Sequence, residues 1–65
     1  MVTAHSKHAR DKQAQQALGA FSCRYTFQVL LWEANANDIY VEARHKTTGV
    51  VRMLVDYDGR VVRYL

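Results

Sequence analysis

Apolar and small residues recur at helical spacing in the first third of the chain and predict one helix over residues 6–21. Ser6 can cap its N-terminus, and the many alanines give the segment a high helix propensity. Gly19 costs about 1 kcal/mol relative to alanine, so the helix is expected to fray or stop near that position. The apolar stripe of this helix consists of Ala14, Ala17, Leu18 and Phe21. Because its side chains are mostly small, the helix is expected to lie close against a flat surface.

Four runs rich in β-branched and aromatic residues follow the helix and predict strands over 24–33, 39–46, 50–57 and 60–65. Asp58-Gly59 predicts a two-residue type I′ hairpin turn, and Thr47-Thr48-Gly49 predicts a three-residue loop. A looser turn fits residues 35–38. The chain is therefore predicted to be an α+β domain in which one N-terminal helix packs on a four-stranded antiparallel meander, in the order α-β-β-β-β.

The predicted turns also set a register for this meander. They pair Ala43 with Met53, Ile39 with Tyr57, Leu31 with Val41 and Val29 with Ala43, and they pair Val55 with Val62. All of these residues share one apolar face, which Tyr25, Phe27, Val51 and Tyr64 extend. We expect the helix to cover this face, because turn signals and side-chain alternation agree on it.

The opposite face of the predicted sheet has no second helix to cover it. The register places Trp32 across from Tyr40 and Leu54 across from Arg63. Exposed apolar patches mark interaction sites, and Trp, Tyr and Arg are the residue types enriched there. An ordinary stabilising cross-strand aromatic pair is the alternative interpretation. The predicted protein-binding surface comprises Leu30, Trp32, Tyr40, Arg44, Arg52, Leu54 and Arg63.

The edges of the sheet suggest self-association. The predicted strand 60–65 is short and carries two arginines, which discourage edge pairing. The predicted strand 24–33 is longer and is charged only at its ends. We therefore expect a homodimer, joined along strand 24–33 or across the open faces, with Trp32 losing solvent on association.

The chain has 65 residues, of which 49% are hydrophobic, so it forms a single small domain with a lean core. This length excludes a two-domain enzyme or a barrel with a deep pocket. The single Cys23 excludes an internal disulfide, which fits a reducing compartment. No apolar run is long enough for a membrane span and no secretory signal is evident, so we expect a cytoplasmic protein without membrane contact. Residues 1–5 are expected to be flexible.

The net charge of +3 is concentrated in residues 1–24, which hold four Lys and Arg against one Asp. A solvated helix face is the commoner explanation of so few charges. The alternative is a nucleic-acid-binding surface in which Tyr40 and Trp32 stack on unpaired bases. Its phosphate-binding candidates are Lys7, Arg10, Lys12 and Arg24.

Catalytic and metal-binding patterns are weak in this sequence. His5 and His8 lie three residues apart, but zinc needs three or four ligands, and the register does not bring Cys23 and His45 to them. Cys23 and His45 have no third orienting group for nucleophilic catalysis. The carboxylates of Asp56 and Asp58 fall at a turn, and the three glycines form no phosphate-binding loop. We therefore expect no enzymatic activity, no metal and no cofactor.

The segment 38–62, DIYVEARHKTTGVVRMLVDYDGRVV, resembles a PepSY-type module. The resemblance covers residues 12–64 and rests on an alanine-rich helix, Tyr40, the turn glycines Gly49 and Gly59, and Val55-Asp56. It implies a non-catalytic module that binds or inhibits peptidases, although PepSY modules lie outside the cytoplasm and this chain shows no secretory signal. In size alone the chain is also similar to phage-encoded inhibitors of host defence, such as anti-CRISPR proteins.

Overall fold

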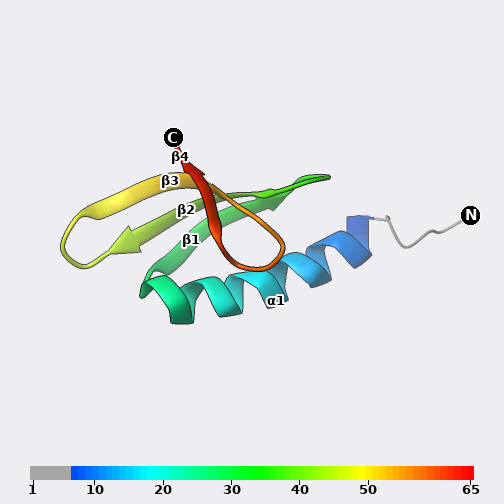
Figure 1. Ribbon diagram of the computed structural model, residues 1–65, viewed down its shortest axis with the longest axis horizontal. Helices are drawn as coiled ribbons and strands as arrows, with labels where there is room; N and C mark the ends of the chain where they lie inside the picture. The colour runs from blue at the N-terminus through cyan, green and yellow to red at the C-terminus, as the bar shows by residue number, and fades with distance from the viewer. Residues whose placement is uncertain (1–6) are drawn as a thin grey trace, which may run out of the picture.

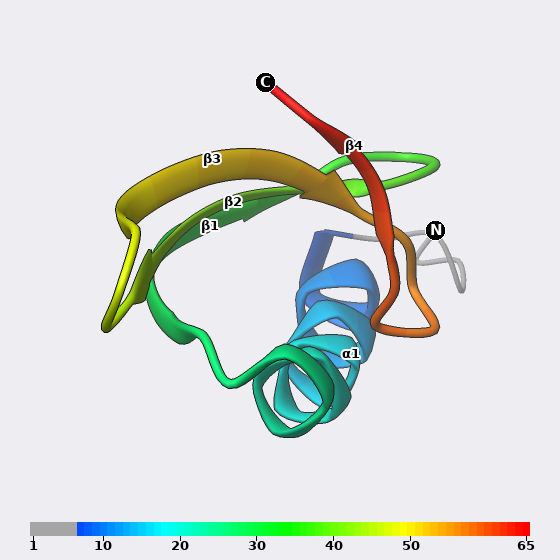
Figure 2. The same cartoon turned by 60° about the vertical axis from the view of Figure 1, so that its left-hand side comes forward.

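A computed structural model describes residues 7–65 as one helix and one sheet. Helix α1 (Lys7–Tyr25) is followed by strands β1 (Gln28–Ala34), β2 (Ile39–His45), β3 (Gly49–Val55) and β4 (Val61–Tyr64). The strands form one antiparallel sheet in the order β1-β2-β3-β4, and α1 lies across one of its faces (Figures 1 and 2). This confirms the predicted α-β-β-β-β fold. The predicted cap Ser6 and the segment 1–5 lie outside the described residues.

The core lies between α1 and the two central strands. All four residues of the predicted apolar stripe of the helix are buried, as expected from their spacing. They pack against Ile39, Val41, Ala43, Met53 and Val55, which are each fully buried. This sheet face is therefore the predicted one, and we call it the inner face.

The β3–β4 turn touches the helix directly (Figure 1), at a place where the helix presents Ala17 and Ala20. A Cβ atom at Gly59 would lie 2.7 Å from the Ala17 carbonyl oxygen and 3.0 Å from the Ala20 Cβ. Arg24 Nη1 also donates a hydrogen bond to the Gly59 carbonyl, at 3.4 Å. Larger side chains on this side of the helix would hold the turn away from it.

The helix continues through Gly19 and ends at Tyr25, so the predicted end near residue 21 and the predicted strand start at Arg24 are wrong. Packing explains the difference: the Phe21 ring lies 5.4 Å from the rings of both Tyr25 and Phe27. Burial of these aromatic rings outweighs their strand propensity. The helix is then closed by Thr26, whose N–H donates to the Ser22 carbonyl at 3.0 Å and whose φ is 56°.

The register between β2 and β3 differs from the prediction by two residues. Val41 pairs with Met53 and Ala43 with Val51, so the predicted pairs Ala43–Met53 and Ile39–Tyr57 are wrong. The loop between the strands comprises residues 46–48, and Gly49 is already paired, at a φ of 84°. Because side chains alternate with a period of two, this shift leaves every residue on its predicted face.

A bulge in β1 reverses the predicted faces of Leu31 and Trp32. Val29 pairs with Ala43 as predicted, but the register shifts before Leu31, and Trp32 then pairs with Val41. Trp32 therefore packs against the core, whereas Leu31 is 50% exposed. The indole offers more apolar surface than a leucine side chain, which favours the arrangement that buries it.

Residues 56–60 join β3 to β4, and within them Asp56 and Arg60 close a turn of three residues, 57–59, and not the predicted two. Asp56 N–H donates to the Arg60 carbonyl, and Asp56 Oδ1 accepts the backbone N–H groups of Asp58 and Arg60, each at 2.9 Å. Gly59 has a φ of 83°, as the last residue of such a loop requires. Leu54 pairs with Arg63 as predicted. Val55, however, pairs with Val61 and not Val62, which is 59% exposed.

Candidate functional site: the open sheet face

No element among residues 7–65 covers the sheet face opposite α1, which we call the open face (Figure 2). Its apolar residues include Leu31, Val50 and Leu65, which are 50%, 56% and 58% exposed. Leu65 belongs to it because its N–H donates to the Arg52 carbonyl, which continues the β4 pairing. The register places eleven residues on this face: Gln28, Leu31, Glu33, Tyr40, Glu42, Arg44, Val50, Arg52, Leu54, Arg63 and Leu65.

Polar contacts fix the centre of the open face. The Tyr40 hydroxyl donates a hydrogen bond to Glu42 Oε2 at 2.7 Å, two residues along the same strand. This bond, together with burial and the Glu42 charge, raises the pKa of Tyr40 above its usual 10.0, and Arg52 opposes the shift. Tyr40 is therefore neutral and held in one orientation, with its ring beside Leu54 on the next strand.

The open face carries most residues of the predicted binding surface, but Trp32 is not among them. Tyr40, Arg44, Arg52, Leu54 and Arg63 share it as predicted. Trp32 does not, because the β1 bulge turns it to the inner face and ends the predicted Trp32–Tyr40 pair.

Leu30 and Leu31 also differ from their predicted roles. Leu30 is the extra residue of the bulge and lies at the rim of a hollow that Leu18 and Trp32 line. Leu31 takes the exposed apolar position in its place, opposite Glu42. The sequence signal for this exchange is the Leu30-Leu31-Trp32 run, in which three large apolar residues cannot all satisfy a strict alternation.

The basic residues of the predicted nucleic-acid surface are spread along the helix. Lys12 is exposed near its start and Arg24 near its end, about 18 Å apart at 1.5 Å per residue. Arg10 is half-buried, and the side chain of Lys7 lies outside the described part of the chain. Since Trp32 packs against the core, it does not join Tyr40 as a stacking surface for bases.

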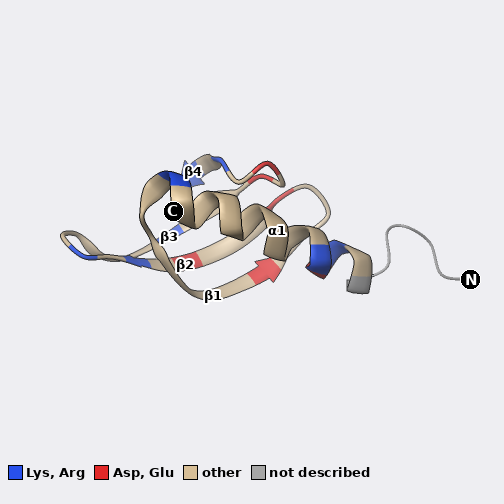
Figure 3. Ribbon diagram, turned by 90° about the horizontal axis from the view of Figure 1, so that it is seen from below, with Lys and Arg blue, Asp and Glu red and all other residues tan. Residues whose placement is uncertain are grey.

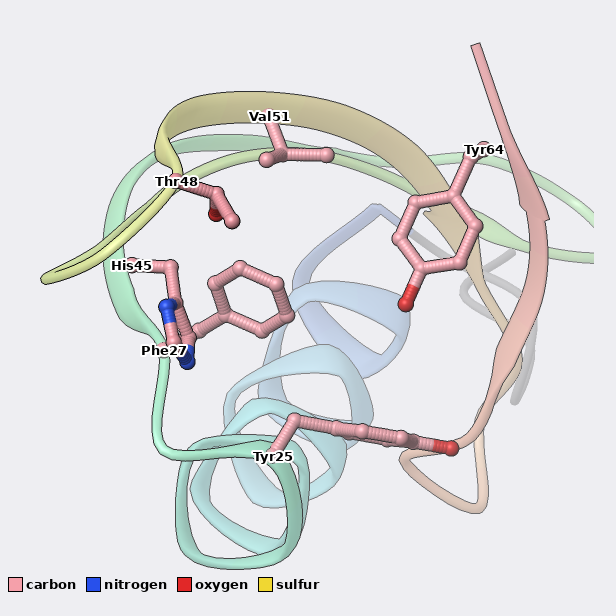
Figure 4. A pocket seen from close by; sticks show the side chains of 6 residues that line it. All are labelled: Tyr25, Phe27, His45, Thr48, Val51 and Tyr64. Atoms are coloured by element: carbon pink, nitrogen blue, oxygen red, sulfur yellow. The ribbon is translucent and has the colours of Figure 1, made fainter.

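An aromatic hollow opens between the end of α1 and the sheet (Figure 4). It measures about 440 Å³ and is lined by Tyr25, Phe27, His45, Thr48, Val51 and Tyr64. The Phe27 and His45 rings meet edge to face at 5.4 Å. The β2–β3 hairpin extends beyond the last turn of the helix, so the inner face is uncovered there (Figure 1). The sequence predicted Tyr25, Phe27, Val51 and Tyr64 on this face but did not predict the hollow.

The residues considered for catalysis are separated or have structural partners. Cys23 is exposed on α1, and within the described part of the chain no hydrogen bond joins it to His45, whose Nδ1 accepts the Thr47 N–H at 3.2 Å. The Asp56 carboxylate holds the β3–β4 turn. His5 and the side chain of His8 lie outside the described residues.

Within residues 7–65, no group of three or more His, Cys, Asp or Glu side chains is placed to hold a metal ion. Nor does α1 have the length of apolar sequence that crossing a membrane requires.

No family model, curated protein or solved structure matches this chain.

Proposed function

We propose that this protein is a non-enzymatic protein-binding module that acts through its open sheet face. The observation that carries the proposal is the combination of exposed Leu31, Val50 and Leu65 with arginines on a sheet face that no element of residues 7–65 covers. Exposed apolar side chains rimmed by polar ones are typical of interaction surfaces. Tyr40 adds an aromatic ring already oriented by Glu42, which lowers the entropy lost on binding.

The composition of the open face favours a protein partner over a nucleic acid. Its arginines, Arg44, Arg52 and Arg63, are accompanied by two glutamates, so the face does not have the uniform positive charge that phosphate binding requires. Inhibition of a peptidase, as the PepSY resemblance suggests, or of a host-defence complex would be narrower forms of this function. Because Cys23 is exposed and the chain has no other cysteine, we expect it to act in a reducing compartment such as the cytoplasm.

A face-specific capture experiment tests this proposal. The double variant Leu31→Thr plus Val50→Thr removes exposed apolar surface from the open face and places a β-branched residue, which favours strands, at both positions. The matched control is Tyr64→Thr, which removes a side chain that is 57% exposed on the inner side, opposite Met53. Partners recovered from cells that express the protein should be lost with the double variant and retained with the control. Equal recovery by the wild type and the double variant would contradict the proposal.

A further inference from the structure

Four of the five charged residues of the open face are divided by sign between the two halves of the sheet; the fifth, Arg44 of β2, lies across from Val50 and stands outside this pattern. Glu33 is the only charged residue of β1, whereas Arg63 is the only charged residue of β4. In the two central strands, Glu42 of β2 lies directly across from Arg52 of β3. Acidic positions therefore lie on β1 and β2, and β3 and β4 carry only basic ones (Figure 3).

The four charges other than Arg44 lie in two rows that run across all four strands, whereas Arg44 lies in a third row with Gln28 and Val50. One row contains Leu31, Glu42, Arg52 and Leu65, and the next contains Glu33, Tyr40, Leu54 and Arg63. Suppose that a second copy of either row is reversed and laid over the first, so that its β4 residue lies over the β1 residue. Each charged residue then faces an opposite charge, and each apolar residue faces another apolar one. A row of this kind is complementary to a reversed copy of itself.

A two-fold axis produces that reversal when it lies between two facing sheets and runs parallel to the strands. It brings β1 of one copy over β4 of the other and β2 over β3, and two sheets packed in this aligned way form a sandwich. Glu33 then faces Arg63 of the second copy, and Leu31 faces its Leu65. A two-fold axis that lies between the sheets but runs perpendicular to the strands would place each strand over the same strand of the second copy. None of these residue pairs would then form.

We propose that the open face binds a second copy of this chain through that two-fold arrangement. This inference rests on the proposed function and names the partner of the same surface. At the centre, Glu42 and Arg52 of the two copies form a square of four alternating charges, in which each charge has an opposite charge beside it and another across the interface. Pairing along the edge of β1 is disfavoured, because a bulge and Glu33 interrupt that edge.

The size of the open face sets the concentration range in which the dimer forms. Four strands about 4.8 Å apart, with a rise of about 3.3 Å per residue, give a face of roughly 15 by 20 Å. A face of this size is smaller than those of stable protein interfaces and belongs to the class of weak, transient ones. The dimer is therefore expected to dissociate in the micromolar range, and more readily at high salt because its rim pairs are exposed.

A charge-swap experiment separates this arrangement from all others. Glu33 and Arg63 lie on opposite edge strands of one chain, so they meet only between copies. In Glu33→Lys a lysine faces Arg63 of the second copy, and in Arg63→Glu two glutamates face each other. Each variant alone should therefore self-associate at least about tenfold more weakly than the wild type. Mixed in equal amounts, the two variants form opposite-charge pairs at both sites and should associate with each other with wild-type affinity.

Sedimentation equilibrium from about 5 µM to about 0.5 mM measures these affinities. The controls Lys12→Glu and Asp58→Lys change charge by the same amounts away from the open face and should leave the affinity unchanged. A monomeric wild type at 0.5 mM, or variants that do not recover in the mixture, would overturn the proposed dimer. If the wild type is monomeric but Leu31→Thr plus Val50→Thr still loses a captured protein, the proposed function stands and only the second copy as partner fails.

Discussion

The contact between the β3–β4 turn and the helix predicts that Gly59→Ala is among the most damaging small substitutions in this chain. Gly59 has a φ of 83°, a conformation that costs an alanine about 1–2 kcal/mol. The added Cβ would also lie 2.7 Å from a backbone oxygen of Ala17, which cannot rotate away as a side chain can. Crowding of this kind costs about 1–3 kcal/mol more.

The two costs together lower the free energy of unfolding by about 2–5 kcal/mol. A chain of this length is stable by roughly 3–10 kcal/mol, at about 0.05–0.15 kcal/mol per residue. Gly59→Ala should therefore lose a large fraction of the total stability at 25 °C. Urea denaturation followed by the fluorescence of Trp32, which packs against the core, measures the loss.

Two other glycines separate the conformational cost from the crowding. Gly49 has nearly the same φ of 84° but no atom within 4 Å of an added Cβ, so Gly49→Ala should cost only about 1–2 kcal/mol. Gly19 lies inside the helix with equally open space, so Gly19→Ala should raise stability by about 0.5–1 kcal/mol. If Gly59→Ala and Gly49→Ala cost the same within about 0.5 kcal/mol, the turn does not touch the helix as described.

Three further predictions concern the end of the helix, the β3–β4 turn and alkaline pH. Thr26→Gly should raise the free energy of unfolding by about 1 kcal/mol in urea denaturation, because Thr26 holds a φ of 56° that glycine adopts without strain. Asp56→Ala should lower it by about 1–2 kcal/mol, because the N–H groups of Asp58 and Arg60 lose their carboxylate acceptor. Burial raises the pKa of Tyr57 above 10.0, so the folded state retains this proton better than the unfolded chain and stability should fall as pH rises above about 10. Thermal unfolding of Tyr57→Phe should show a smaller alkaline loss, and an unchanged loss would contradict that role of Tyr57.

The helix stripe and the central strands could be predicted because local signals agree there. Ala14 and Phe21 fall at helical spacing, and Val41 and Val55 fall on one parity of their strands, whichever turn joins them. The predicted residues of the inner face in β2 and β3 are therefore correct, although the register between these strands differs from the prediction by two residues. An Asp-Gly turn, by contrast, suits loops of two or three residues, and the local sequence does not choose between them.

The exchange of Leu31 and Trp32 could not be predicted from local patterns, because it depends on which of the two side chains gains more from burial. Strict alternation from Val29 places Leu31 inward, and only the greater burial available to the indole favours a bulge. The aromatic hollow is equally non-local, because it depends on where the helix ends relative to the β2–β3 hairpin. The charge pattern of the open face was readable in part, since Arg52 and Arg63 were expected there, but Glu33 joined it only through the bulge.

An intermolecular nuclear Overhauser measurement on a mixture of isotope-labelled and unlabelled protein is the sharpest test of the two-fold dimer through the open face. Leu31 and Leu65 lie on opposite edge strands, about 14 Å apart at 4.8 Å per strand, which is too far for a contact within one chain. In the two-fold arrangement their methyl groups face each other. We expect intermolecular signals between Leu31 and Leu65 that grow with protein concentration. Intermolecular signals confined to α1 or Tyr64, or none at about 0.5 mM, would contradict this dimer.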